Sequence, residues 1–345
     1  MEVLIEMEKI LVIQTAFVGD AILTLPMVEK LKDKFPSSEI DVLCIPSTRE
    51  IFEASPFVSK VLVIDKKKAH KYLLKLYKFT NEIRNSGYTK IFSSHRSIRT
   101  SFMVMQSGVR DTYGFSNSAF FHIYKNVVEY KTNIHEVQRN LDLIDYEYSS
   151  ESWRIIPQVR INESSWQKVA QFFSSNNIKD KLIAFAPGSI WGTKKYPEQY
   201  FKAIIKYFID RSYKALIIGG ESDKELCERL SVGYNGEVIS AAGSFSIIES
   251  IELLKSVKLL LTNDSAPTHL GMCADIPVLT IYCSTIPEIG FYPYNKKSSY
   301  ISFNDLSCKP CGIHGHAKCP ISTFDCGYKL DPEIIISKME ELISE

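Results

Sequence analysis

The stretch LLLTNDSAPTHLG (residues 259–271) decides the fold. It opens with apolar residues, which are followed at once by polar side chains and by a helix-like pattern from about residue 266. This order is typical of a buried strand in a parallel sheet, with the polar residues at its carboxyl end. Ligands of open α/β sheets bind past these carboxyl ends. The stretch therefore predicts a fold class and also the place of a site.

The alternation of apolar runs and helical patterns continues on both sides of this stretch. In the second half the sequence predicts strands at 181–186, 214–220, 237–240, 257–264 and 277–282. Helices are expected there at 163–175, 197–211, 222–231, 246–256, 266–274 and 331–344. In the first half we expect strands at 9–15, 40–45, 60–65 and 89–94, and helices at 20–35, 69–86 and 133–148. Strands that alternate with helices predict a parallel sheet covered on both faces.

The length of 345 residues suggests two domains. The alternation is lost at residues 149–160, where serines, Trp153 and Pro157 suggest a linker. We therefore expect two facing, Rossmann-like, doubly wound α/β domains, 1–155 and 156–345, with a C-terminal helix that can pack back on the first. The active site is expected in the cleft between them.

Charge and composition exclude several classes of protein. Lys+Arg 41 against Asp+Glu 40 gives a net charge of +1, which argues against a dedicated nucleic-acid binder. No apolar run approaches the ~18 residues of a membrane-spanning helix. The acidic start MEVLIEME does not fit an export signal, and eight cysteines are too few for a disulfide scaffold. We therefore expect a reducing, cytoplasmic setting.

The motif AFVGDAILTLP (16–26) places Gly19 and Asp20 at a strand-to-helix junction. Glycine permits a tight turn and close backbone approach. Asp20 has two interpretations, because an aspartate at this position either caps the helix or displays a carboxylate toward substrate.

The motif FAPGSIWGTKKYP (185–197) carries a loop of small residues and a lysine from a strand into a helix: Gly188, Ser189, Gly192, Thr193 and Lys194. Backbone amides, hydroxyls and a lysine suit phosphate oxygens. The loop contains neither a Walker A pattern nor GxGxxG. An ordinary glycine-containing loop is the alternative interpretation.

In IIGGESDKE (217–225), Gly220 ends a strand and Glu221 stands at a helix entrance. A carboxylate here is suited to ribose hydroxyls, as in nucleotide-binding folds, or it caps the helix.

In the stretch that opens this section, five residues lie at the helix start: Asp264, Ser265, Ala266, Thr268 and His269. The positive end of the helix dipole attracts a diphosphate, by roughly 0.3–1 kcal/mol per charge. A structural histidine is the alternative for His269.

The segment CKPCGIHGHAKCPISTFDC contains Cys308, Cys311, Cys319 and Cys326. CxxC followed by two further cysteines is compatible with a tetrahedral, structural zinc site, with His314 and His316 as other ligands. Disulfides fit a cytoplasmic protein poorly, and free thiols are the remaining interpretation.

The tract KKKAHKYLLKLYK (66–78) holds six lysines and no acid. It is either a solvated helix face or a contact for an anionic acceptor or membrane surface. Arg96 and Arg99, just after a predicted strand, are suited to carboxylates or phosphates of an acceptor.

The ordered set GDAILTLP, PGSIWGTKKYP, GGE and NDSAPTHLG resembles glycosyltransferase family 9, the family of ADP-heptose:lipopolysaccharide heptosyltransferases. The match runs over nearly the whole chain. IHEVQRNLDLI (134–144) and the cysteine-rich tail also look like this family, and the tail is similar to the heptosyltransferase II type. The sequence departs from the family where Cys283 to Pro287 replace a usual Gly-Pro-Thr-Asp-Pro.

The resemblance implies a GT-B fold and an inverting heptose transfer that needs no catalytic metal or other cofactor. It implies a general base at Asp20, a donor-phosphate contact at Lys194 and a ribose contact at Glu221. The loop from Asp264 to His269 would hold the diphosphate and sugar. The implied partners are an ADP-sugar donor and a lipid-linked oligosaccharide acceptor, which places the protein on the cytoplasmic face of the inner membrane. Another nucleotide-sugar enzyme of this fold, such as an epimerase, and a non-catalytic sugar-nucleotide-binding protein are the alternatives.

Overall fold

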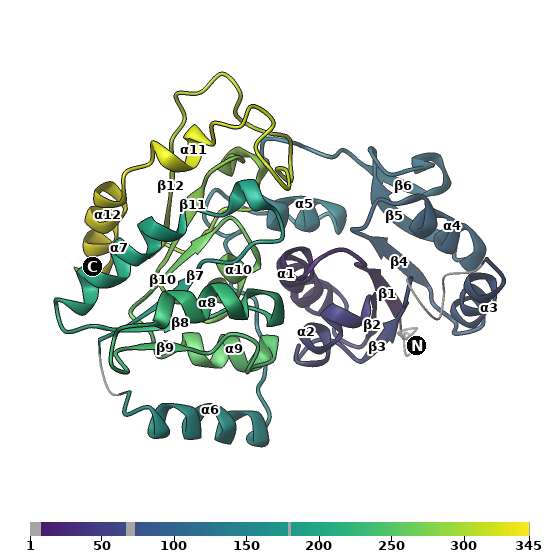
Figure 1. Ribbon diagram of the computed structural model, residues 1–345. Coiled ribbons are helices and arrows are strands. Elements are labelled where there is room, and N and C mark those ends of the chain that lie inside the picture. Colours follow the sequence, from purple (N-terminus) through teal and green to yellow (C-terminus); the bar gives the residue numbers. More distant parts are fainter. Residues whose placement is uncertain (1–7, 67–72, 179–180, 345) are drawn as a thin grey trace. The chain divides into compact units, whose positions relative to one another are not determined.

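The computed structural model describes residues 8–66, 73–178 and 181–344 (Figure 1). The chain forms two compact units, Met1–Arg160 and Ile161–Glu345. The division falls at the end of the predicted linker. No helix in the described ranges is both long and apolar enough to cross a membrane.

The first unit is built on a six-stranded sheet in which every pair of neighbours is parallel. Its strand order is β3-β2-β1-β4-β5-β6. The strands are β1 (Lys9–Ile13), β2 (Glu39–Cys44), β3 (Lys60–Val63), β4 (Lys90–Ser93), β5 (Asp111–Phe115) and β6 (Asn126–Val128). The order reverses between β1 and β4, which are neighbours in the sheet but not in the sequence.

Helices connect these strands. They are α1 (Val18–Lys34), α2 (Arg49–Glu53), α3 (Leu73–Arg84), α4 (Ile98–Ser107) and α5 (Glu136–Leu143), with short 3₁₀ turns η1 (Pro46–Thr48) and η2 (Phe121–Ile123). Helix α1 packs against α5, and α3 packs against α4 (Figure 1). Part of the basic tract 66–78 and the predicted start of the helix 69–86 lie outside the described residues.

The second unit repeats this plan with the order β12-β11-β10-β7-β8-β9, again parallel throughout. The strands are β7 (Leu182–Ala186), β8 (Lys214–Ile217), β9 (Val238–Ser240), β10 (Leu259–Asn263), β11 (Val278–Tyr282) and β12 (Ser299–Ser302). Every residue of β7, β10 and β11 is buried, as expected for central strands covered on both faces.

The helices of the second unit are α6 (Glu163–Ser175), α7 (Glu198–Ile209), α8 (Lys224–Ser231), α9 (Ile247–Leu254), α10 (Ala266–Cys273), α11 (Asp325–Tyr328) and α12 (Pro332–Ser344). Three 3₁₀ turns, η3 (Gly192–Lys194), η4 (Glu221–Asp223) and η5 (Pro287–Ile289), follow strands. Helix α12 lies beside α7, and Ile335 and Met339 belong to the core of this unit (Figure 1).

The predicted doubly wound parallel architecture is confirmed in both units. The prediction missed β5, β6 and β12, as well as α2, α4 and α11. The missed strands lie toward the edges of their sheets and have mixed sequences such as DTYGF and SYIS, without the continuous apolar run of a central strand.

Candidate functional site

The second unit brings two predicted motifs together where the strand order reverses, between β7 and β10. Asn263, the last residue of β10, is fully buried. Its side-chain amide donates to the Pro187 carbonyl at 2.8 Å, and its side-chain oxygen accepts from the Tyr196 N–H at 3.0 Å. The loop after β7 is thereby tied at both ends to the end of β10.

Within this arrangement the Lys194 ammonium lies 2.6 Å from the Asp264 carboxylate, and both side chains are only 12% exposed. Thr285, after β11, donates a second hydrogen bond to the same carboxylate at 2.6 Å. A cation is thus held at the carboxyl ends of three neighbouring strands, where an anionic ligand is expected.

Helix α10 starts directly after Asp264, with Ser265 at its N-cap. The Ser265 hydroxyl makes no cap bond and instead faces the carbonyls of Gly188 and Asn263 at 3.4 and 3.3 Å. The start of α10, whose first residue is Ala266, therefore has no capping side chain, and it follows the carboxylate that pairs with the lysine.

Thr268 and His269 are both buried in α10. The Thr268 hydroxyl is engaged inside the fold, 3.0 Å from that of Thr280. Burial lowers the pKa of His269 to about 4; the charge of Asp264 acts against this lowering, and that of Lys194 adds to it. Among the described residues its Nδ1 has no hydrogen-bond partner. A neutral imidazole with an unused nitrogen therefore lies near the ion pair.

For Glu221, which follows Gly220, the interpretation as a helix cap is wrong. Its interpretation as a ribose contact stays a prediction. The Glu221 side chain is 76% exposed and pairs with Lys224 at 2.7 Å. The Gly220 N–H instead donates to Asp223 at 3.0 Å, so Asp223 caps this turn. Asp223 also contacts the backbone of Gly188, where a Cβ would lie 2.5 Å from its carboxyl carbon. The sequence analysis missed Asp223, although its spacing from Gly220 is that of a capping box.

The cysteine-rich segment packs against the loop that carries Lys194. Thr193 is buried, its N–H donates to the His316 carbonyl at 3.0 Å, and its hydroxyl accepts from the His316 N–H at 2.8 Å. The Trp191 ring stacks on His314 with 6.0 Å between ring centroids. Ser189, at the start of the loop, accepts a hydrogen bond from the Trp191 N–H. The segment 308–326 therefore helps to fix where Lys194 lies.

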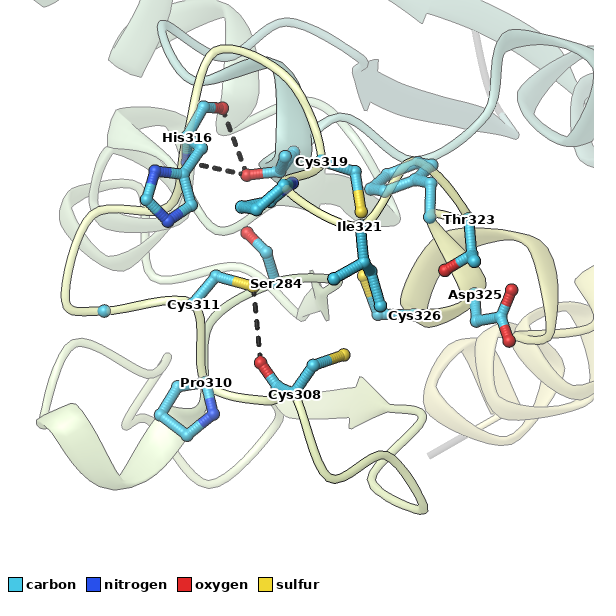
Figure 2. Close-up of a pocket in the computed structure, with 14 residues that line it drawn as sticks. Ser284, Cys308, Pro310, Cys311, His316, Cys319, Ile321, Thr323, Asp325 and Cys326 are labelled. Carbon is cyan, nitrogen blue, oxygen red and sulfur yellow. Dashed lines mark hydrogen bonds between the residues drawn. The ribbon is translucent and has the colours of Figure 1, made fainter.

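The four cysteines of this segment line one cavity of about 320 Å³, together with Thr193, Ser284 and His316 (Figure 2). All are free thiols. Although burial acts the other way, backbone amides of residues 321–324 lower the pKa of Cys319. Within the described ranges, no three His, Cys, Asp or Glu side chains are arranged to hold a metal ion. The structural zinc at Cys308, Cys311, Cys319 and Cys326 stays a prediction.

In the first unit, Asp20 lies in the first turn of α1 and is half-buried. Its carboxylate accepts a hydrogen bond from the Phe17 N–H at 3.3 Å, so it does act as a cap. Burial raises the pKa of Asp20, although backbone hydrogen bonds and the charge of Arg96 oppose the rise. A cap with raised proton affinity is also suited to take up a proton, so the two interpretations are compatible. Gly19 precedes it in the same turn.

Cations gather at the carboxyl ends of β3 and β4. Lys66 donates to the Thr15 carbonyl and hydroxyl at 3.0 and 2.7 Å. Burial and the charge of Arg99 lower its pKa to about 8. Burial, with the charges of Lys66 and Arg96, lowers the pKa of His95 to about 4. The sequence analysis selected Arg96 and Arg99 as candidate site residues but missed His95. It also did not distinguish Lys66 from the other lysines of the basic tract.

Solved structures with the same fold include glycosyltransferases. A glycosyl transferase family 9 protein from Veillonella parvula DSM 2008 superposes with a TM-score of 0.82 at 23% identity, over 97% of each chain. E. coli ADP-heptose LPS heptosyltransferase II superposes with a TM-score of 0.78 at 18% identity, over 97% of this chain and 98% of its own. Two Rossmann-like units in one chain form the GT-B fold.

The sequence comparisons identify the family to which the chain belongs. The profile of glycosyltransferase family 9 (heptosyltransferase) matches residues 76–319. Lipopolysaccharide heptosyltransferase 2 of Escherichia coli K12 is 21% identical over 81% of this chain and 84% of its own length. Lipooligosaccharide heptosyltransferase 2 of Campylobacter jejuni serotype O:6 is 22% identical over 97% and 99%. The chain belongs to glycosyltransferase family 9.

The contact between the cysteine-rich segment and the lysine loop can be tested at Gly192. A Cβ on Gly192 would lie 2.1 Å from the Ala317 carbonyl oxygen, so backbone has to move. We expect Gly192→Ala to lower the free energy of unfolding by about 1–3 kcal/mol in urea denaturation. Gly220→Ala is the control, because its Cβ would meet only Asp223, at 3.8 Å, and should change stability by less than about 0.5 kcal/mol. Equal effects of the two substitutions would contradict the packing argument.

Proposed function

We propose that this protein transfers a heptose from ADP-heptose to an acceptor sugar of the lipopolysaccharide inner core, with inversion at the anomeric carbon. The half-buried Lys194 ammonium at the start of α10 carries this proposal, because it is a preformed site for a nucleotide diphosphate. The names of the relatives support the donor and acceptor. A solved heptosyltransferase from E. coli that holds ADP-2-deoxy-2-fluoro heptose shares the fold with a TM-score of 0.71.

The second unit, approximately the domain 156–345, is proposed to bind the donor. Lys194 and the amides at the start of α10 would meet the negative charge that develops on the leaving diphosphate. Exposed Glu221 would accept hydrogen bonds from ribose hydroxyls. The remaining donor contacts are assigned to the loops around these residues: Gly188, Ser189, Thr193, Gly220, Asp264, Ser265, Ala266, Thr268 and His269.

The first unit, approximately the domain 1–155, is proposed to bind the acceptor. Asp20 would take the proton from the attacking hydroxyl, and Gly19, the residue before it, would permit close approach to the backbone. Arg96 and Arg99 would bind carboxylate or phosphate groups of the acceptor, because both belong to the cations after β3 and β4: Arg96 lies over the Tyr130 ring, and the charge of Arg99 acts on Lys66. Inner-core sugars that carry such groups fit this cationic surface.

The transfer step is proposed to need no metal, because a lysine and a helix start are present where the leaving group's charge develops. If the four cysteines hold zinc, its role is structural, since four thiolates leave no open coordination position.

We also propose that the exposed lysines of α3 help the protein to dock on the anionic inner face of the cytoplasmic membrane. Lys75, Lys78 and the apolar Leu74 are all exposed on this helix. A lipid-linked acceptor places such a contact next to the substrate.

The central experiment is turnover with purified protein, a lipid-linked inner-core acceptor and either ADP-heptose or a UDP-sugar. We expect acceptor-dependent release of ADP, a product of inverted anomeric configuration by NMR, and full activity after treatment with EDTA. Turnover with the UDP-sugar alone would identify another nucleotide-sugar enzyme. Binding of ADP-heptose without product would identify a non-catalytic sugar-nucleotide-binding protein.

Asp20→Asn should lower kcat by about 10²–10⁴-fold, the usual contribution of a general base. Because the raised pKa of Asp20 must be crossed to form the carboxylate, wild-type kcat should fall as the pH drops through that pKa. The variant should lose this acidic limb. Near-normal turnover of a folded Asp20→Asn protein would exclude the residue as the base.

Reversing charge at Lys75→Glu and Lys78→Glu should weaken co-sedimentation with vesicles rich in anionic lipid by at least about tenfold, since each surface lysine contributes roughly 1 kcal/mol. The same reversal at Lys202 and Lys338 of the second unit is the control. Unchanged binding of the α3 variant would remove this helix from the membrane contact.

A further inference from the structure

A buried ion pair lies in the first turn of α5, the helix that packs against α1. The Glu136 carboxylate is 2.9 Å from the Arg139 guanidinium, and the two side chains are only 5% and 2% exposed. A charged pair at this depth is costly to desolvate. The Glu136–Arg139 pair therefore needs a physical explanation, because it lies on the helix that packs against α1, which carries Asp20.

Backbone carbonyls hold the arginine in place. The Arg139 Nε donates to the Lys131 carbonyl at 2.7 Å, and Nη2 donates to the Thr132 carbonyl at 3.0 Å. Arginine does not lose its proton in proteins, so its charge is permanent. The position of the Glu136 carboxylate is fixed in turn by a charged, immobilised partner.

Tyr130 connects this pair to the cations at the end of β4. The Arg96 guanidinium lies 4.1 Å from the centre of the Tyr130 ring, and that of Arg139 lies 4.8 Å from it. Two positive groups thus share one aromatic ring. The Glu136 carboxylate is the ion-pair partner of one of them, Arg139.

Asp20 is coupled electrostatically to this cluster. Helix α5 is attached to α1 by the Asn140 side chain, which donates to the Leu23 carbonyl at 3.0 Å. Burial raises the pKa of Glu136; the hydrogen bond from Arg139 acts against this rise, and the charge of Asp20 adds to it. The charge of Arg96 lowers the pKa of both carboxyls.

The titratable and charged groups that act on Asp20 or Glu136, or on their neighbours, come from several elements. Arg96 and His95 follow β4, and Lys66 follows β3 and acts on His95. Tyr130 follows β6. From α5 come Glu136 and Arg139. Of these, Glu136 is the carboxylate that pairs with Arg139 and on which the charge of Arg96 also acts.

We propose that Glu136 is a positioning residue for the reaction: anchored by Arg139, its carboxylate offsets the cations around Asp20, so that Asp20 binds the proton of the acceptor hydroxyl. This inference rests on the proposed role of Asp20 as the base. Without the charge of Glu136, Arg96 stabilises the Asp20 carboxylate too strongly, and Asp20 becomes a weaker base.

The test is the pH profile of kcat in Glu136→Gln, Glu136→Asp and wild-type protein. In Glu136→Gln we expect the acidic limb to move to lower pH and the plateau of kcat to fall by roughly three- to tenfold, a part of what a general base contributes. Glu136→Asp keeps the charge and should restore most of both. Glu82→Gln, an exposed acid on α3, is the matched control and should leave the profile unchanged.

A purely structural role for the pair would lower stability without moving the limb. Because Glu136→Gln leaves Arg139 buried without this partner, it is paired with the double variant Glu136→Gln/Arg139→Gln, which leaves neither charge behind. The double variant should also show the shift to lower pH, since Glu136 is the member coupled to Asp20. Arg96→Gln should move the limb the opposite way, to higher pH.

The pKa of the Asp20 carboxyl can be measured by NMR without substrate, with Asp20→Asn used to assign its signal. This measurement distinguishes the role inferred for Glu136 from the proposed function. If Glu136→Gln lowers the pKa of Asp20 but no variant or wild type turns over, the environment inferred here stands and the proposed function fails. If folded Glu136→Gln and the double variant both leave the Asp20 titration and the acidic limb unchanged, the role of Glu136 is overturned.

Discussion

The ion pair between Lys194 and Asp264 is the interaction on which the site of the second unit depends. With 2.6 Å between the charged atoms and little exposure of either side chain, the attraction is screened far less than at an open surface. The two residues come from loops 70 positions apart along the chain, and buried Asn263 joins those loops. In the proposed function a diphosphate competes with Asp264 for the lysine. Donor binding then exchanges one partner of the cation for another and avoids leaving a buried charge alone.

The charged groups of the first unit are arranged differently from those of the second. Cations outnumber anions around the start of α1, and burial lowers the pKa values of Lys66 and His95 so that part of this positive charge is lost. The same burial raises the pKa of Asp20, which helps a carboxyl to accept a proton. Desolvation therefore lowers the positive charge of Lys66 and His95 and raises the proton affinity of Asp20. This desolvation results from the way the strand ends are packed.

The sequence predicted the fold well because central parallel strands carry a strong signal. β7, β10 and β11 are continuous apolar runs that end in polar residues, and such runs are buried on both faces of a sheet. Edge strands such as β6 and β12 are short and only partly buried, so their sequences resemble loops. Helix α4 was missed between a correctly predicted strand and an unrecognised one.

Within the site, the sequence by itself determined which residue types stand at the carboxyl ends of the strands, because each motif follows its strand directly. It placed Asp20, Lys194 and Asp264 at strand-to-helix junctions. Only the tertiary structure decided which side chains meet. It attached Asn140 of α5 to Leu23 of α1 and packed His316 on Thr193. Local spacing fixes the face of an element on which a residue lies, but contacts between segments more than a hundred residues apart follow from the packing of whole sheets and helices.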